Sequence, residues 1–479
     1  MSPLIGRKEQ VAILQEALAS ADPEMVALIG RRRVGKTFLV RHVYAESLVF
    51  QLTGLQTGGL HEQLRNFALS FARAFPEEPL VASDTVDWLG AFDRLGRVLE
   101  ARVESGSKPV VFLDELPWLG TKRSGFIRAL GYFWNSYASR LPLVVVICGS
   151  AASWMIDRVI NDKGGLHNRV TKLLYLQPFT LAETEAFCRA KGIQLPRYQI
   201  LQVYLTMGGI PMYLNQLRPV LSAAQNIQAI CFARDGYLRR EFERLFASLF
   251  DNYEQHVAVV RALATKRIGL TKPDLARAAK LTTGGGLNRI LSDLSESGFI
   301  AEYGGYGKKR RDRLFRLTDF YTLFYLTYIE RLGPSTSPTD FQQLSNLPAW
   351  KSWTGYTFEN VCLTHLPQIK RSLGIAGIAT TTASFYARAD EGGPGAQIDL
   401  LIERADQTIH LCEAKFTEEP LPVSTALLDT FRRKRSVFVR HSRTRAHLLN
   451  TLITTYAPTG NWAARGIDQV VTLDELFAD

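Results

Sequence analysis

The pattern Gly-x-x-x-x-Gly-Lys-Thr at residues 30–37 constrains the fold of this chain more than any other feature. A short apolar run, Met25–Ile29, precedes it, and an apolar-periodic stretch, Phe38–Tyr44, follows it. The apolar run indicates a buried strand, and the periodic stretch indicates a helix. The sequence therefore predicts a strand, a phosphate-binding loop and a helix, in that order.

Each residue type in this loop has a mechanical role in holding nucleotide phosphates. Glycines let backbone N–H groups close around the phosphates, and the N-terminus of the following helix adds positive charge. Lys36 is expected to reach the β- and γ-phosphates of ATP, and Thr37 to give its hydroxyl to Mg²⁺. The predicted ATP contacts are Gly30, Arg31, Arg32, Arg33, Val34, Gly35, Lys36 and Thr37. A chance match in an ordinary strand-to-helix turn is the alternative.

A second apolar run, Pro109–Leu113, ends in the acidic pair Asp114-Glu115 and is typical of a fully buried parallel strand. The carboxyl ends of such strands form the ligand crevice of an α/β sheet. Asp114 is therefore expected to hold Mg²⁺ through water, and Glu115 to polarise the water that attacks the γ-phosphate. An ordinary acidic strand-to-loop junction is the alternative.

Residues 1 to about 240 resemble the AAA-related ATPases of the archaeal type, within the wider STAND-like group. The resemblance is carried by an ordered set of motifs, namely Ile5-Gly6-Arg7, the phosphate loop, Asp114-Glu115, Gly149-Ser150, Asn168-Arg169, Pro178-Phe179 and Gly208-Gly209-Ile210-Pro211. It implies an ATPase core that uses ATP and Mg²⁺ and is followed by a helical lid.

The resemblance also implies roles for three further residues. Ser150, after a predicted strand at Leu143–Cys148, matches a polar sensor beside the γ-phosphate, unless it only caps the next helix. Arg169 matches an arginine that acts in trans on a neighbouring subunit's γ-phosphate, which implies a homo-oligomer; a surface arginine without that duty is the alternative. Pro211 matches an element beside the nucleotide base, or belongs to a plain helix-breaking turn.

From about residue 256 the pattern resembles a winged helix. Three predicted helices and two short strands follow one another at Val257–Ala264, Lys272–Ala279, Leu287–Ser297, Phe299–Tyr303 and Leu314–Leu317. Residues 307–313 form a predicted hairpin tip dense in lysine and arginine that could neutralise several DNA phosphates. Asn288, Arg289 and Ser292 share one helical face and are candidates for contacts to base edges. The alternatives are a solvated basic hairpin and a winged helix that docks on protein.

The C-terminal part places carboxylates on two predicted strands, 395–402 and 409–415. Asp399 is expected to open the first strand, while Glu413 and Lys415 project from one face of the second. Carboxylates that hold Mg²⁺ or Mn²⁺ over a phosphodiester, with a lysine that orients water, form a metal-dependent nuclease arrangement. Further strands are predicted at 436–440 and 469–473. The basic run 432–435 is a candidate phosphate contact, although a solvated helix end is the commoner explanation.

This segment resembles the PD-(D/E)xK superfamily, as found in DUF234-like C-terminal domains. Glu359, in a helix that precedes the two strands, matches the family's first acidic position. The resemblance implies a restriction-endonuclease-like α/β domain. Two alternatives stay open: a core of this kind that has lost cutting activity, and carboxylates at 399 and 413 that only pair with nearby arginines.

Composition and net charge limit the classes of protein to which this chain can belong. The 479 residues, 46% of them hydrophobic, are enough for two or three globular cores. The five cysteines occur singly, which indicates a reduced, cytoplasmic chain without a structural metal. No apolar run approaches a membrane span, so no membrane partner is expected. A formal net charge of +11 favours polyanions, and DNA is the leading candidate partner.

The predicted fold class is α/β, with a P-loop AAA-like ATPase core at 1–180, a helical lid at 181–250, a winged helix at 251–335 and a restriction-endonuclease-like domain at 345–479. The predicted function is ATP hydrolysis coupled to DNA, with a metal-dependent C-terminal nuclease domain. The rival is a nucleotide-switched signalling ATPase whose winged helix and inactive nuclease-like domain bind protein or DNA without cutting.

Overall fold

The structure is a computed structural model that describes residues 3–103, 108–161, 163–307, 313–332, 341–389, 393–462 and 466–478. The chain divides into two compact units. The N-terminal unit comprises the chain up to Pro178 together with residues 245–251 and 292–298. The C-terminal unit comprises residues 179–244, 252–291 and 299 onward.

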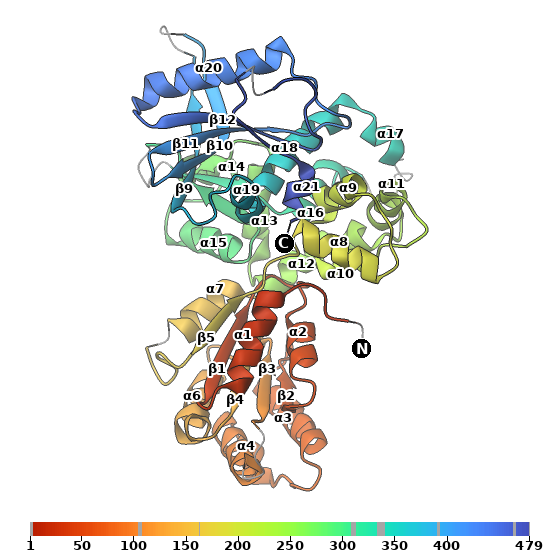
Figure 1. The fold of residues 1–479 in the computed structure, drawn as a ribbon. Coiled ribbons are helices and arrows are strands. Elements are labelled where there is room, and N and C mark those ends of the chain that lie inside the picture. Colours follow the sequence, from red (N-terminus) through yellow and green to blue (C-terminus); the bar gives the residue numbers. More distant parts are fainter. Residues whose placement is uncertain are drawn as a thin grey trace. The chain divides into compact units, whose positions relative to one another are not determined.

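The N-terminal unit is built on a sheet of five parallel strands in the order β2-β3-β4-β1-β5 (Figure 1). The strands are β1 Glu24–Ile29, β2 Leu48–Thr53, β3 Val110–Asp114, β4 Val144–Gly149 and β5 Lys172–Tyr175. All residues of β1, β3 and β4 are buried, which explains why their sequences are apolar runs, apart from Glu24 at the start of β1 and Asp114 at the end of β3. These three strands confirm the three that the sequence predicts.

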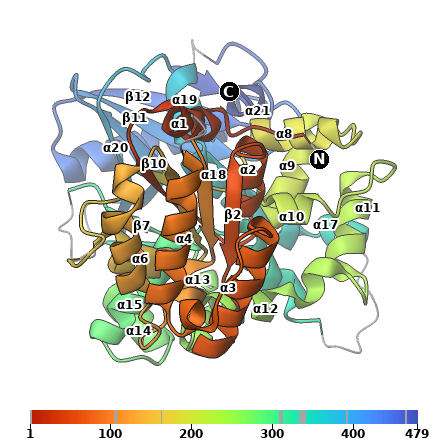
Figure 2. The same ribbon diagram turned by 90° about the horizontal axis from the view of Figure 1, so that it is seen from below.

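Helices pack against both faces of this sheet. They are α1 Lys8–Ala19, α2 Lys36–Val43, α3 Leu60–Ala74, α4 Trp88–Val103, α5 Leu116–Leu119, α6 Phe126–Ser136 and α7 Ala152–Met155. Figure 2 shows α3, α4 and α6 as neighbours, and their aromatic side chains form one core cluster with alternate residues of β1, including Met25 and Ala27. Tyr44, just after α2, donates a hydrogen bond to the carbonyl of Leu14 in α1 over 2.8 Å. Because β1, β4 and β3 are neighbouring parallel strands, their carboxyl ends lie at the same edge of the sheet.

The C-terminal unit begins with short helices. They are α8 Leu181–Ala190, α9 Arg197–Met207, α10 Pro211–Leu214 and α11 Ala223–Ile227. The next helix in the chain is α12 Glu241–Leu249, whose residues from 245 onward belong to the N-terminal unit. Later in the chain come α16 Phe320–Phe324, α17 Phe341–Ser345, α18 Pro348–Thr364 and α19 Leu366–Ser372. In the described part of the chain, no helix combines the length and the hydropathy that a membrane span requires.

Residues 253–317 form three helices and a small antiparallel sheet. The helices are α13 Tyr253–Ala264, α14 Lys272–Ala278 and α15 Gly285–Glu296, and the sheet has the order β6-β8-β7. Its strands are β6 Leu270–Thr271, β7 Ile300–Tyr303 and β8 Leu314–Leu317. The predicted helices and both predicted strands are confirmed. The cationic tip of the predicted hairpin, residues 308–312, lies outside the described residues.

The last part of the chain forms a second five-stranded sheet in the order β13-β12-β11-β10-β9 (Figure 1). Its elements are β9 Thr380–Ala387, β10 Ala396–Arg404, β11 Thr408–Lys415, α20 Thr425–Ser442, β12 His447–Thr454, β13 Gln469–Val471 and α21 Leu473–Leu476. β9, β10 and β11 pair antiparallel, whereas β12 pairs parallel with β11 and with β13. The predicted adjacency of the two carboxylate-bearing strands is confirmed.

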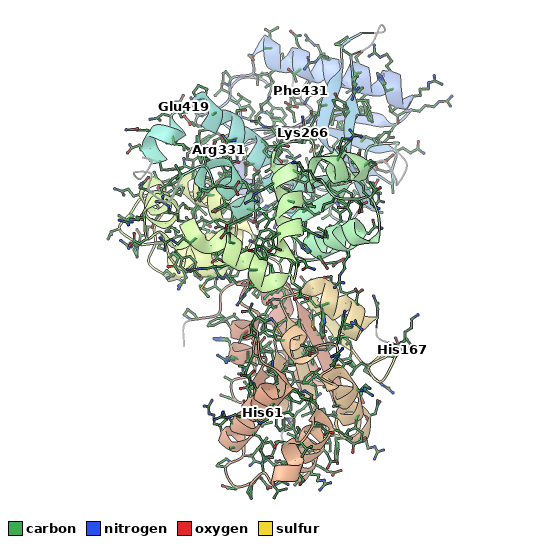
Figure 3. All side chains as sticks on the ribbon, turned by 180° about the vertical axis from the view of Figure 1, so that it is seen from behind. His61, His167, Lys266, Arg331, Glu419 and Phe431 are labelled. Atoms are coloured by element: carbon green, nitrogen blue, oxygen red, sulfur yellow. The ribbon has the colours of Figure 1, made fainter. Side chains whose placement is uncertain are left out.

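The strand predicted at residues 436–440 is wrong, because these residues belong to helix α20. Their β-branched and aromatic composition favours a strand locally. The buried residues of the segment instead recur at helical spacing, from Leu427 and Phe431 to Phe438. Phe431, labelled in Figure 3, packs in a core cluster with Leu452 of β12. Packing of this helix against the sheet overrides the local preference.

The small sheet and the large sheet of the C-terminal unit are joined through the backbone. Beyond β7, the Tyr306 N–H donates to the Ser384 carbonyl over 2.7 Å, and the Ser384 N–H donates to the Gly304 carbonyl over 3.1 Å. The ring of Tyr306 packs on Phe438 of α20, with centroids 5.0 Å apart. The three-stranded sheet is therefore an integral part of the C-terminal unit.

Candidate functional sites

The loop between β1 and α2 is a tight turn whose shape depends on glycine. A Cβ at Gly30 would lie only 2.4 Å from the carbonyl oxygen of Leu176, so only glycine fits there. Gly35 has a φ of 94°, and Arg33 has a φ of 74°. These left-handed conformations fold the loop back on itself and lead directly into the first residue of α2.

Lys36 is buried at the start of α2 and donates three hydrogen bonds. Its Nζ lies 2.8 Å from the Gly30 carbonyl oxygen, 3.0 Å from the Arg31 carbonyl oxygen and 3.0 Å from Ser150 Oγ. The first two contacts close the loop around the ammonium group. The third connects the loop after β1 to the end of β4, so the structure brings Lys36 and Ser150 together.

Thr37 and Asp114 also meet at this edge of the sheet. Thr37 Oγ1 donates to Asp114 Oδ2 over 2.7 Å, and Asp114 Oδ1 accepts the Glu115 N–H over 3.0 Å. Asp114 is only 3% exposed at the end of β3. A hydroxyl and a carboxylate placed together are hard oxygen ligands of the kind that Mg²⁺ prefers, so these two residues fit the ion in kind.

Glu115 is held by Ser150. Ser150 Oγ donates to Glu115 Oε1 over 2.8 Å, and the Ser150 N–H donates to Glu115 Oε2 over 3.3 Å. The hydroxyl of Ser150 does not cap α7, whose N-cap is Ala151. A continuous hydrogen-bonded chain therefore runs from Lys36 through Ser150 to Glu115, and it contains the groups that the sequence assigns to the γ-phosphate.

The other loop residues pack into the protein rather than facing solvent freely. Arg31 and Val34 are buried, and the Arg32 guanidinium lies 5.6 Å from the ring centre of Trp118. Arg7 donates from Nη2 to the Val34 carbonyl over 3.3 Å. The Ile5-Gly6-Arg7 motif predicts no specific role for Arg7. Its contact shows that the residue before α1 supports the loop.

Arg169 and Pro211 are not members of the hydrogen-bonded chain from Lys36 to Glu115. Arg169 is an exposed residue of the N-terminal unit, in the turn before β5. Pro211 opens α10 in the C-terminal unit. The turn before it packs tightly on the backbone, since Gly209 accepts the Phe179 N–H over 2.6 Å and a Cβ at 209 would lie 2.0 Å from the Phe179 oxygen.

The C-terminal unit contains a cavity of about 580 Å³ that we call the carboxylate cavity. The charged and amide side chains of its lining come from α18, the segment after β9, β10, β11 and α20, and they are Glu359, Arg388, Gln397, Asp399, Glu413, Arg433 and Lys434. Three residues that the sequence assigns to a nuclease site, Glu359, Asp399 and Glu413, thus line one cavity although they are up to 54 positions apart in the chain.

The sequence predicts that Asp399 is the first residue of its strand. This prediction is wrong, because β10 already begins at Ala396. The pairing between β10 and β9 shifts register between Ile398 and Leu401. Such a bulge re-aims side chains and interrupts strict alternation, which sequence spacing alone does not reveal. Within the cavity, Gln397 Nε2 donates to Asp399 Oδ1 over 2.6 Å.

Glu413 is a buried carboxylate held between two lysines. Lys415 Nζ lies 2.9 Å from Glu413 Oε1, so both residues project from one face of β11 as expected. Lys434 of α20 forms an ion pair with the other carboxylate oxygen. Burial alone raises the pKa of Glu413, but the positive charges of Lys434 and Lys415 outweigh it, so the pKa is lowered.

Glu359 is paired with a buried arginine from the small sheet. Arg316 Nη2 of β8 lies 2.9 Å from Glu359 Oε2, and its guanidinium stacks 4.5 Å from the Tyr356 ring centre. Burial and the nearby charge of Asp399 raise the pKa of Glu359 to about 7, against the effect of Arg316. No local sequence signal identifies Arg316, because it comes from a different sheet.

The carboxylates of this cavity are oxygen donors of the kind that Mg²⁺ and Mn²⁺ accept. Their oxygens are engaged by Arg316, Gln397, Lys415 and Lys434. Throughout the described ranges, no group of three or more His, Cys, Asp or Glu side chains is arranged to hold a metal ion. A cation at Asp399 and Glu413 would therefore have to displace contacts that these residues now make.

Comparisons with known proteins show which protein family the N-terminal part of the chain matches. Residues 4–217 match a family described as an ATPase domain predominantly from Archaea. The protein MJECL04 of Methanocaldococcus jannaschii, itself described as uncharacterized, is 22% identical over 376 residues, which are 77% of this chain and 78% of that protein.

Solved structures also align with the chain. The Walker-type ATPase of Pyrococcus abyssi aligns with a TM-score of 0.47 and 19% identity, over 68% of this chain and 96% of that one. The ORC2 protein of Aeropyrum pernix aligns with a TM-score of 0.42 and 13% identity, over 69% and 94%. The family match coincides with the phosphate loop, the acidic strand end and the parallel sheet described above. The N-terminal part of this chain, residues 4–217, is therefore an ATPase domain of the archaeal type.

Proposed function

We propose that this protein couples its ATPase domain to DNA and cuts DNA with a metal-dependent site in the C-terminal unit. The observation that carries the nuclease part is the carboxylate cavity. Its acidic residues Glu359, Asp399 and Glu413 come from one helix and two strands and line one space beside the cations Arg433 and Lys434. A phosphodiester is the substrate class that such a mixture of metal-binding oxygens and cations suits.

In the ATPase site, bound Mg²⁺ would neutralise charge on the phosphates of ATP. Thr37 and Asp114 are the residues proposed to hold it, the latter through water. Lys36, which now contacts its own loop and Ser150, would donate to the β- and γ-phosphates instead. Glu115 would then orient the attacking water, with Ser150 beside it. Arg169, exposed in the N-terminal unit, is proposed to act on a second copy, and Pro211 to contact the base.

In the carboxylate cavity, Asp399 and Glu413 are proposed to hold Mg²⁺ or Mn²⁺, which would polarise the scissile phosphate. Lys415 is proposed to orient the attacking water, and Glu359 to complete the acidic set. The order α18, β9, β10, β11, α20 and β12 supports a restriction-endonuclease-like domain, since three antiparallel strands are followed by a helix and a parallel strand.

DNA contact is proposed for residues 253–317. The order of three helices and two β-strands, with a short strand β6 that completes the sheet, supports a winged helix. Asn288, Arg289 and Ser292 of α15 are all exposed, as residues that read base edges must be. The formal net charge of +11 favours polyanions such as DNA over neutral or basic partners.

A second function is favoured by one specific observation. Glu413 already has a cation on each carboxylate oxygen, and Glu359 is paired with Arg316. Such pairs can hold a nuclease-like fold together without any metal. In that case the protein is a nucleotide-switched ATPase whose C-terminal unit binds DNA or protein without cutting.

The test is a cleavage assay with the full chain on supercoiled and linear DNA, in Mg²⁺ or Mn²⁺, with and without ATP. We expect wild-type protein to cut, and Asp399→Ala to lose at least about 100-fold in rate because a metal ligand is removed. Lys36→Ala keeps the carboxylate cavity and loses the phosphate clamp, so it reports whether ATP gates the cutting.

The outcomes separate the two functions. Cutting that persists in Asp399→Ala would place the activity elsewhere and contradict the nuclease assignment. DNA binding without cutting by wild type, under every condition, would favour the binding-only ATPase. The binding itself is checked by its salt dependence, since each phosphate contact adds about one unit to the slope of log affinity against log salt.

A further inference from the structure

The two lysines that hold Glu413 differ in where they lie. Lys434 belongs to the lining of the carboxylate cavity, whereas Lys415 does not appear in that lining. The Lys434 side chain is 14% exposed, against 42% for Lys415. The more buried and central cation is therefore the one supplied by α20, and the sequence motif on β11 supplies the outer one.

The position of Lys434 is built by the fold. It lies on the face of α20 that also carries Phe431 and Phe438, which pack against the sheet and fix the helix in place. Arg433, its neighbour, also lines the cavity. Arg432 is 70% exposed and pairs with Asp429 on the same helix. Only part of the basic run 432–435 thus faces the carboxylates.

A buried ammonium group beside a buried carboxylate competes directly with any other cation for that carboxylate. A divalent ion on Glu413 would have to break the Lys434 ion pair, and both positive charges would then repel each other at short range. A freed ammonium group in a cavity is costly unless it gains a new anionic partner. The phosphate of a bound nucleic acid is such a partner.

We propose that Lys434 is a counter-ion within the carboxylate cavity. It forms an ion pair with Glu413 until a divalent cation binds, and its ammonium group then contacts a phosphate of the DNA. Lys434 is thus a positioning residue for a phosphodiester. This inference rests on the proposed nuclease function for its substrate class, and on the ion pair and cavity lining for its residue.

The first measurement is Mn²⁺ binding to the full chain by calorimetry, without DNA or nucleotide. Binding that disappears in Asp399→Ala is assigned to the carboxylate cavity. In Lys434→Gln, we expect this Mn²⁺ affinity to rise about tenfold, because the competing cation is gone. Lys415→Gln should raise it less, since Lys415 is the more exposed partner.

The second measurement is DNA binding in Ca²⁺, with a duplex of fixed length. We expect Lys434→Gln to weaken DNA binding about three- to tenfold and to lower the salt slope by about one, as for one lost phosphate contact. Lys434→Arg keeps the charge and should restore both readings toward wild type. Arg432→Gln removes the same charge from the same helix outside the cavity, and should leave the Mn²⁺ affinity unchanged.

If the role of Lys434 is purely structural, Lys434→Gln should weaken the affinities for both Mn²⁺ and DNA. If Lys434 is a counter-ion, the same substitution should raise the Mn²⁺ affinity and lower the DNA affinity. Unchanged or weaker Mn²⁺ binding in a folded Lys434→Gln would overturn the inference, as would a larger gain in Lys415→Gln. Wild type that binds Mn²⁺ through Asp399 but cuts no DNA would sink the nuclease proposal alone, because the two binding measurements would still test Lys434.

Discussion

At the scale of single residues, Gly30 tests the geometry of the phosphate loop most directly. Its replacement by alanine would place a Cβ 2.4 Å from the Leu176 carbonyl oxygen, and neither backbone can move without breaking the pairing of β1 with β5. We expect Gly30→Ala to destabilise the N-terminal unit by about 1–3 kcal/mol and to weaken ATP binding. Urea unfolding and nucleotide titration measure these two effects.

Gly59→Ala is the matched control for this substitution. Gly59 has an extended backbone at the start of α3, and an added Cβ would meet no atom closer than 3.9 Å. Its cost should therefore stay below about 1 kcal/mol, the difference between glycine and the poorer N-cap residue alanine. Equal stability losses in both variants would show that the close approach at Gly30 does not constrain the loop.

The two candidate sites differ in how many of their residues can be predicted from the sequence. Lys36, Thr37 and Asp114 are visible in the sequence because the loop and the strand end fix their neighbours along the chain. Lys434 and Arg316 are not, because each reaches the carboxylate cavity from an element that the motif does not include. Only the folded sheet shows that these cations share the carboxylates.

At the scale of elements, His365 ties two groups of helices in the C-terminal unit. It sits between α18 and α19, and its Nε2 accepts the Leu181 N–H at the start of α8 over 3.0 Å. Its Nδ1–H donates to the Val361 carbonyl over 2.9 Å. Both contacts require the neutral imidazole with the proton on Nδ1. Complete burial lowers the pKa of His365 to about 4.

This lowered pKa predicts a loss of stability in acid. The unfolded chain takes up the proton near pH 6.5, whereas the folded chain resists it until about pH 4, so the unfolded state binds more protons between these values. Stability should fall by up to about 3 kcal/mol as the pH drops from 6.5 to 4. Urea unfolding at several pH values measures this, and His365→Gln should flatten the dependence.

His447→Gln serves as the control for the loss of an imidazole. His447 is exposed at the start of β12, so its removal should leave the slope of stability against pH as in wild type. His410 is a second buried histidine, and burial lowers its pKa to about 4 as well. Part of the acid sensitivity will therefore remain in His365→Gln. A slope identical to wild type would contradict the role of His365.

The elements also show where sequence reasoning stops. Fully buried strands such as β1, β3 and β4 are predictable, because almost every residue is apolar and the run ends at a polar turn. Residues 436–440 have a similar apolar centre, Val437–Val439, and yet form part of α20. This segment packs on the strands β9, β10 and β12 and does not pair with a strand. The position of Asp399 depends on a bulge in the pairing of β10 with β9. Residue spacing along β10 alone cannot predict such a bulge.

At the scale of the whole molecule, the division into two compact units predicts how nucleotide affects unfolding. The phosphate loop, Asp114 and Ser150 all belong to the N-terminal unit, and the carboxylate cavity belongs to the C-terminal unit. A ligand stabilises only the structure that binds it, by about 2.7 kcal/mol at 100 times its dissociation constant. A non-hydrolysable ATP analogue with Mg²⁺ should therefore raise the unfolding midpoint of the N-terminal unit.

Scanning calorimetry of the full chain tests this with two variants. Lys36→Ala removes the ammonium group that would meet the phosphates, so the nucleotide shift should disappear while both units remain folded. Asp399→Ala alters only the carboxylate cavity and should keep the full shift. A shift that survives in Lys36→Ala would contradict the nucleotide site. A single unfolding transition whose midpoint rises with nucleotide would show instead that the two units unfold together. In that case ATP binding would also stabilise the C-terminal unit.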